Sequence, residues 1–142
     1  MAFNPLALDN QLCCPLYAAS KEVTRRYKPF LDPLGLTYTQ YVTMMALWEK
    51  DSVSVKELGK RLYLDSATLT PLLKRLESHG YIMRQRSKED ERSVIISLTQ
   101  EGRDLREKAL EVPKGIGSCI RMDPQDALQL KALLTKMLDA FD

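Results

Sequence analysis

The sequence predicts a mainly α-helical fold that contains one small β-hairpin. Over most of the chain, apolar residues recur every three or four positions, which is the period of an amphipathic helix. Only two short, neighbouring segments alternate apolar and polar residues as strands do. The chain has 142 residues, of which 44% are hydrophobic and 28% charged, enough for one domain with its own core. We therefore expect a single domain over residues 1–142.

The first expected helix runs from Leu8 to about Tyr27. Pro15 lies inside it and should kink the helix or restrict its start, and Pro29 and Pro33 should break the chain after it. A second helix is expected to begin in the run TYTQ, where threonine and glutamine stand three residues apart and can form a capping box. This helix carries toward the core Tyr41, Met44, Met45 and Trp48.

The next segment predicts two helices joined by a short turn. Ser54 begins a capping box for a helix over 55–62, and Asp65 can cap a longer helix over 66–79 that ends at Gly80. Two helices joined by a turn of three or four residues form the minimum helix-turn-helix unit.

Two short strands are expected directly after this unit, in YIMRQR and SVIISL, with SKEDER as the polar tip of the hairpin. Thr99 can cap a further helix to about Val112, Pro113 and two glycines should interrupt it, and Asp123 should start a last helix. A helix-turn-helix followed by a hairpin is the order of a winged helix with a two-stranded wing.

A winged helix binds double-stranded DNA through the second helix of the unit, whose N-terminal residues face base edges. Residues 66–86 contain four basic residues and one acidic residue, a net of +3, whereas residues 123–142 have a net of −2. At the wing tip, Arg92 can enter a minor groove, with Asp90 or Glu91 holding its guanidinium. The alternative is that these charges form only a solvated face. The candidate DNA contacts are Ser66, Thr68, Thr70, Lys74, Arg75, Arg84, Arg86, Asp90 and Arg92.

Composition excludes several other classes. No apolar run approaches the ~18 residues that a membrane-spanning helix needs, and the N-terminus lacks the features of a secretion signal. Three cysteines do not make a disulfide framework and favour a reducing cytoplasm, where a thiol can be reactive. A single histidine, His79, argues against a histidine-rich metal site and a Ser-His-Asp hydrolase. No metal or cofactor is expected.

The strings LYLDSATLTPLLKRLESHGYI and RSKEDERSVIISLTQEG resemble the MarR family of bacterial winged-helix repressors, including the DER tripeptide in the wing. The resemblance covers nearly the whole chain. It implies a homodimer that binds a pseudo-palindromic operator, with dimerisation helices in 1–36 and 113–142 around a winged-helix region, 37–112. The apolar stripes of the terminal helices fit such an interface, although a single-chain core would show the same stripes.

Within that family, LDNQLC, YAAS, YKP, LTYTQY and LYLDS resemble the OhrR type, which senses organic hydroperoxides. This resemblance implies that Cys13 is the oxidised residue and that Tyr27 and Tyr38 hydrogen-bond its sulfur. Cys13 and Tyr27 are 14 residues apart on one expected helix, which places them about 21 Å apart. Any contact must therefore join Cys13 to Tyr27 of the partner subunit.

Oxidation would proceed by attack of a thiolate on the peroxide oxygen to give a sulfenic acid. The first turn of a helix and phenolic donors both favour the thiolate. Selectivity for organic hydroperoxides is expected from an apolar surround made of Leu12, Leu16, Met44 and Met45.

The resemblance also implies that Cys119, in the expected break before the last helix, can resolve the sulfenic acid as an intersubunit disulfide with Cys13. Some members use a small external thiol instead, and a cysteine near two glycines can also be an apolar filler. Cys14 departs from the type. It should point ~100° away from Cys13 on the helix, into apolar packing.

Two other functions remain open at this point. A MarR-type repressor can be released by a small aromatic or phenolic ligand, in which case Cys13→Ser would keep the response. A thiol peroxidase could use Cys13 and Cys119, but no general base or arginine stands at a recognisable spacing from either. We therefore expect a regulator and not an enzyme.

Overall fold

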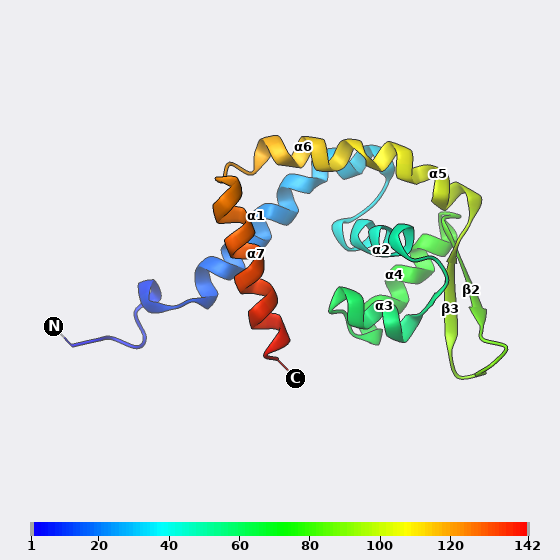
Figure 1. The fold of residues 1–142 in the computed structure, drawn as a ribbon, viewed down its shortest axis with the longest axis horizontal. Helices are drawn as coiled ribbons and strands as arrows, with labels where there is room; N and C mark the ends of the chain where they lie inside the picture. The colour runs from blue at the N-terminus through cyan, green and yellow to red at the C-terminus, as the bar shows by residue number, and fades with distance from the viewer. Residues whose placement is uncertain (1, 142) are drawn as a thin grey trace.

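The structure is a computed structural model that describes residues 2–141 and is mainly helical (Figure 1). The helices are α1 (Cys13–Leu31), α2 (Tyr38–Glu49), α3 (Val55–Leu62), α4 (Ser66–Ser78), α5 (Gln100–Ala109), α6 (Glu111–Cys119) and α7 (Pro124–Asp139). The strands are β1 (Val53–Ser54), β2 (Ile82–Arg86) and β3 (Val94–Leu98). The expected winged helix-turn-helix is therefore confirmed as the fold class.

The first helix is shifted toward the C-terminus relative to the expected range. It begins at Cys13, after a separate 3-10 turn over Leu8–Asn10. Pro15 is its third residue, in the first turn, where a backbone N–H has no helical partner to lose. The expected break at Pro29 is wrong. α1 continues to Leu31, whose side chain is 2% exposed, and burial of that side chain holds the last turn despite the missing donor.

The expected interruption near Pro113 is also wrong. Pro113 lies in the first turn of α6, and Leu110, between α5 and α6, keeps helical dihedrals (φ −60°, ψ −24°). The break occurs later, between Cys119 and Pro124. Gly115 belongs inside α6 because a Cβ at that position would collide with the ring of Phe30 on α1. Close packing of α6 on α1 therefore overrides the low helix propensity of glycine.

The sheet has three antiparallel strands in the order β1-β3-β2. The expected hairpin of β2 and β3 is joined by the two-residue strand β1, in which Val53 pairs with Ile96. Asp51, just before β1, accepts the backbone N–H of Leu98 at 2.9 Å, so the root of the wing is tied to the end of α2.

The core lies between α2, α3, α4 and the sheet, and its most buried members include Leu47, Leu58, Leu69, Leu76 and Ile96. Trp48 packs against this core, as expected, and its indole N–H donates to the carbonyl of Gly102 at 2.8 Å. Met44 is buried, whereas its neighbour Met45 is 39% exposed, so the expectation that both point into the core is wrong for Met45.

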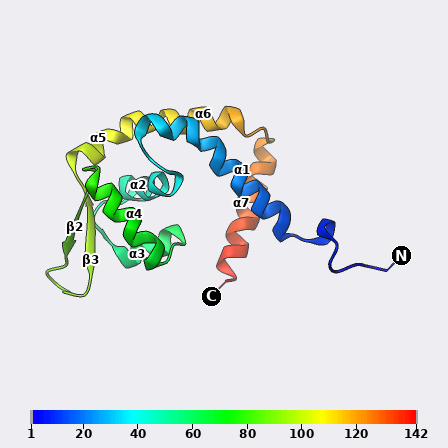
Figure 2. The same ribbon diagram turned by 180° about the vertical axis from the view of Figure 1, so that it is seen from behind.

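The end of α1, α5 and the start of α6 also contribute buried side chains to this core, namely Leu31, Leu105, Ala109 and Val112, whereas α7 contributes none. α5 and α6 run as one bridge away from the wing, and α7 descends from the far end of the bridge, on the opposite side of the molecule from the β2–β3 hairpin (Figures 1 and 2). None of the residues of α7 is buried. Among residues 2–141, no helix is long and apolar enough to cross a membrane.

Candidate DNA interface and thiol site

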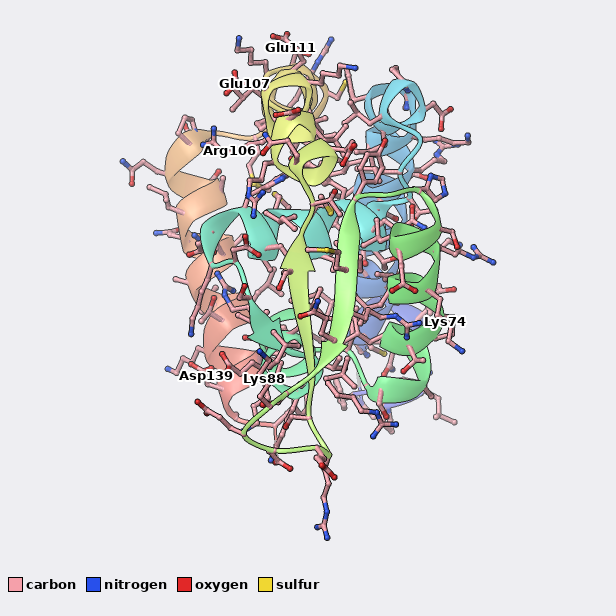
Figure 3. The ribbon with its side chains drawn as sticks, turned by 90° about the vertical axis from the view of Figure 1, so that its right-hand side faces the viewer. Lys74, Lys88, Arg106, Glu107, Glu111 and Asp139 are labelled. Atoms are coloured by element: carbon pink, nitrogen blue, oxygen red, sulfur yellow. The ribbon has the colours of Figure 1, made fainter. Side chains whose placement is uncertain are left out.

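Helix α4 is anchored at its start by a side-chain cap. The Asp65 carboxylate accepts the backbone N–H of Thr68 at 2.8 Å, and this hydrogen bond holds the pKa of Asp65 below its usual value. Four leucines of α4 face the core, which fixes the rotation of the helix. The exposed positions of α4 include all those predicted to contact DNA, namely Ser66, Thr68, Thr70, Lys74 and Arg75. Figure 3 shows Lys74 pointing outward from α4.

The two basic residues of β2 are held by contacts within the chain. Arg84 is half-buried, and its Nη2 donates to the Glu77 carboxylate of α4 at 3.0 Å. This hydrogen bond from Arg84 lowers the pKa of Glu77. Arg86 is exposed and donates from Nη1 to the carbonyl of Glu91 at 3.1 Å. The predicted contacts on β2 are therefore oriented by α4 and by the wing tip.

The wing tip differs from the expectation in its hydrogen bonds. Asp90 Oδ1 accepts the backbone N–H of Arg92 at 3.0 Å and so shapes the turn. No ion pair between the Arg92 guanidinium and Asp90 or Glu91 occurs within the described part of the chain, so that expectation is wrong. The Arg92 side chain is exposed beyond the turn. Lys88, a wing cation not predicted as a contact, is also exposed and lies near the tip (Figure 3).

The three thiols lie on α1 and α6. Cys13 is the first residue of α1 and is exposed, Cys14 is half-buried, and all three thiols are free. Cys119 is the last residue of α6 and is exposed, so its expected place in a loop is corrected to a helix end. Of the expected apolar surround of Cys13, Met44 is buried in the core, whereas the side chains of Leu12 and Leu16 are exposed.

Tyr27 and Tyr38 lie together, far from Cys13 within one chain. Their ring centroids are 4.9 Å apart, although they come from α1 and α2. Tyr41, 3% exposed, joins them with its ring 5.8 Å from that of Tyr27. Burial, and after it the neighbouring phenols, raises the pKa of Tyr27 and of Tyr41, which moves both hydroxyls further from ionisation. Like any protonated phenol, both can donate a hydrogen bond at neutral pH. Tyr41 was predicted only as a core residue, and its spacing of three from Tyr38 was the available signal.

A cleft of about 440 Å³ lies where α2 meets α5 and α6. Apolar side chains line it together with one cation, Arg106, and one anion, Glu49. The complete lining is Tyr41, Met45, Trp48, Glu49, Arg106, Ala109, Leu110 and Pro113. A cleft of this size between α2 and the α5–α6 segment is large enough to hold a small aromatic molecule.

A capped, exposed helix beside a cationic hairpin defines a winged-helix DNA-binding protein. A family profile described as "Transcriptional regulator SarA/Rot" matches residues 25–109. The organic hydroperoxide resistance transcriptional regulator of Bacillus subtilis (strain 168) is 50% identical over 137 residues, which cover 96% of this chain and 93% of the relative. The regulator SarZ of Staphylococcus saprophyticus is 39% identical and covers 93% of this chain and 90% of its own.

Solved structures of AbfR, the Staphylococcus epidermidis protein, also match. Reduced AbfR bound to DNA superposes with a TM-score of 0.80 at 35% identity, covering 93% of this chain and 90% of that one. Disulfide-formed AbfR superposes with a TM-score of 0.68 at 37% identity, covering 92% of both. The chain belongs to the MarR/SarA-type family of winged-helix transcriptional regulators, OhrR type. It is a regulator and not an enzyme, which removes the thiol peroxidase alternative.

Proposed function

We propose that this protein is a redox-controlled repressor of the cytoplasm that binds a pseudo-palindromic operator as a homodimer and is released when an organic hydroperoxide oxidises Cys13. One observation carries the proposal. Cys13 and the Tyr27–Tyr38 pair lie near opposite ends of α1, about 21 Å apart by helical rise, so they can meet only between two chains. A sensor site built across the interface couples oxidation to the spacing of the two DNA-binding halves.

The terminal helices supply the interface in this proposal. Within one chain, no side chain of α7 is buried, and four of its leucines are more than a third exposed. The N-terminal half of α1 is also exposed, with Tyr17 and Leu16 on its surface. Apolar surface of this extent is stable when a second copy covers it. This supports dimerisation through 1–36 and 113–142.

Chemically, the Cys13 thiolate attacks the terminal oxygen of the hydroperoxide. The O–O bond breaks, the sulfur gains the oxygen as a sulfenic acid, and the organic fragment leaves as an alcohol after taking a proton. The thiol of Cys119 from the partner subunit then attacks the sulfenic sulfur, forming a disulfide and releasing water. The exposed end of α6 supports access to Cys119.

The comparison with AbfR supports a link between DNA binding and shape, since the overoxidised form bound to DNA also superposes well, with a TM-score of 0.79. This chain superposes better on the reduced, DNA-bound form than on the disulfide form, with TM-scores of 0.80 and 0.68. The two forms have nearly the same identity to this chain, 35% and 37%, so sequence distance does not account for the difference. The described conformation is therefore more similar to DNA-bound AbfR than to disulfide-formed AbfR.

A gel-shift titration with an organic hydroperoxide and with hydrogen peroxide tests the proposal. We compare the wild type with Cys13→Ser, Cys14→Ser and Cys119→Ser. Cys13→Ser should stay bound at every dose, whereas Cys14→Ser should be released like the wild type. Cys119→Ser should lose the covalent dimer on a non-reducing gel. Release of Cys13→Ser by hydroperoxide, or a covalent dimer formed by Cys119→Ser, would contradict the corresponding step.

The cleft between α2 and α5–α6 favours a second candidate, release by a small phenolic or aromatic ligand. In that case Arg106 would bind an anionic group of the ligand. Titrating the protein–operator complex with salicylate, in the absence of oxidant, separates the two mechanisms. A response that persists in Cys13→Ser and is lost in Arg106→Ala would assign control to the cleft.

A further inference from the structure

The turn between α3 and α4 contains a tyrosine in a backbone conformation that disfavours it. Tyr63 has φ 58° and ψ 38°, in the left-handed region. Among the non-glycine residues of the described chain, only Ser52 shares a positive φ. The conformation is required because Tyr63 ends α3, where the backbone N–H groups of Tyr63 and Leu64 both bond the carbonyl of Gly59. Glycine or asparagine is the usual residue at such a position.

The fold makes no visible use of the Tyr63 side chain. The side chain is 61% exposed, and within residues 2–141 it takes part in no hydrogen bond and no aromatic pair. Ser52 differs, since its hydroxyl lies 3.1 Å from that of Ser97 and its N–H bonds Asp51. A strained backbone with an idle, exposed side chain points to a partner outside the chain.

The surroundings of Tyr63 are cationic. A hollow of about 570 Å³ between α3 and α4 is lined by Tyr63, Lys56, Lys60, Asp65 and Ser66, together with apolar atoms. Lys56 and Lys60 are exposed, lie one turn apart on α3, and have no carboxylate within 4 Å in the described chain. The nearby Asp65 carboxylate is engaged by the Thr68 N–H. Two ammonium groups and one carboxylate therefore line the hollow, which leaves it with a net positive charge.

We propose that Tyr63, with Lys56 and Lys60, binds the DNA phosphate backbone beside the major groove that α4 enters. The Tyr63 hydroxyl donates to a phosphate oxygen, and the two ammonium groups neutralise neighbouring phosphates. α3 and the start of α4 lie on the same side as the wing tip (Figure 1), so one duplex can reach all three. This inference rests on the proposed function, since it needs α4 in the groove, and it adds a contact that fixes register without reading sequence.

The reduced homodimer is tested with Tyr63→Phe and Tyr63→Gly, measuring operator affinity, its salt dependence and Tm. Tyr63→Phe should weaken operator binding about 100-fold, because each of the two copies loses one hydrogen bond to a charged group and each such bond is worth about tenfold. Tyr63→Gly should weaken binding at least as much while its Tm equals or exceeds that of the wild type, because glycine relieves the disfavoured φ. Wild-type affinity in Tyr63→Phe, or a lower Tm in Tyr63→Gly, would overturn the inference.

Lys60→Ala is compared with Lys108→Ala, an exposed lysine on α5, away from this face. Lys60→Ala removes one phosphate contact from each of the two copies, so it should lower the slope of log affinity against log salt by about 2 and weaken operator and scrambled DNA equally. Lys108→Ala should match the wild type. If Lys60→Ala and Lys108→Ala have the same DNA affinity and the same salt slope, the inference is overturned. The proposed function fails separately, if the wild type shows no preference for operator over scrambled DNA.

Discussion

The Arg84 guanidinium on β2 donates to the Glu77 carboxylate on α4 at 3.0 Å, which joins the wing to the helix proposed to enter the groove. Arg84 is the middle residue of β2 and Glu77 lies near the end of α4, so the ion pair ties together the two elements that we propose contact one duplex. Both side chains are partly exposed, at 30% and 40%. The Arg84–Glu77 ion pair should therefore contribute little to the total free energy of unfolding. Its effect should be visible mainly in the orientation of the wing and in how stability depends on pH.

Replacing Glu77 should change how stability depends on pH. The hydrogen bond from Arg84 holds the pKa of Glu77 below its usual value of 4.5, so the stabilisation is present above that value and is lost as pH falls through the lower, folded value. The Tm of the wild type should exceed that of Glu77→Gln at pH 7, and the gap should close below pH 4.5. A gap that is constant from pH 7 to pH 3 would contradict the pairing.

Substitutions at the two glycines of α6 should have opposite effects. Gly115→Ala forces a Cβ into the ring of Phe30 and should destabilise the protein by about 1–3 kcal/mol. Gly117→Ala meets no atom within 4 Å and should stabilise the helix by about 0.5–1 kcal/mol. Chemical denaturation at one fixed protein concentration measures both. If the two variants change stability in the same direction, α6 does not pack on α1 as described.

A charge on the exposed side of α7 should separate the dimer. Leu133 is 64% exposed in the single chain, and Leu133→Glu should raise the dimer dissociation constant at least about 100-fold, because each of two copies loses a buried leucine. Lys131→Ala, on the same helix, is the control and should leave the dimer intact. Analytical ultracentrifugation checks both, and a dimeric Leu133→Glu protein would place the interface elsewhere.

Removing the phenolic hydroxyl of Tyr27 should slow oxidation of Cys13, and it should leave the affinity of the reduced protein for the operator unchanged. The Tyr27 hydroxyl is protonated at neutral pH and can donate, and loss of that donor should slow sulfenic acid formation about tenfold. Trapping with dimedone, followed by mass spectrometry over time, measures the rate in Tyr27→Phe. Tyr81→Phe, whose ring stacks on His79, should react at the wild-type rate.

Capping residues in the sequence correctly predicted where α2, α3, α4 and α5 begin. Thr37, Ser54, Asp65 and Thr99 each accept the backbone N–H three residues ahead, as expected from capping patterns. Such bonds depend only on neighbouring residues, so they can be read without the fold. The order of helix, turn, helix and hairpin followed from them.

The features that sequence missed depend on contacts between distant segments. α6 runs through Pro113 and Gly115 because Phe30 of α1 packs against it, and propensity alone gave a break there. The strand β1 exists only because Val53 pairs with Ile96. Tyr41 joins the tyrosine pair only after α1 and α2 have docked. The roles of the thiols and of the DNA contacts stay predictions, since they depend on a second chain and on a duplex.

The helical dihedrals of Leu110 make residues 100–119 a nearly unbroken rod, about 30 Å long at 1.5 Å per residue. One end of this rod carries Cys119, and the other emerges from the root of the wing. A tilt of about 5° at the thiol end displaces the opposite end by about 2–3 Å, so the rod acts as a lever. Two such levers in a dimer would move both hairpins off their half-sites together, without unfolding either winged helix.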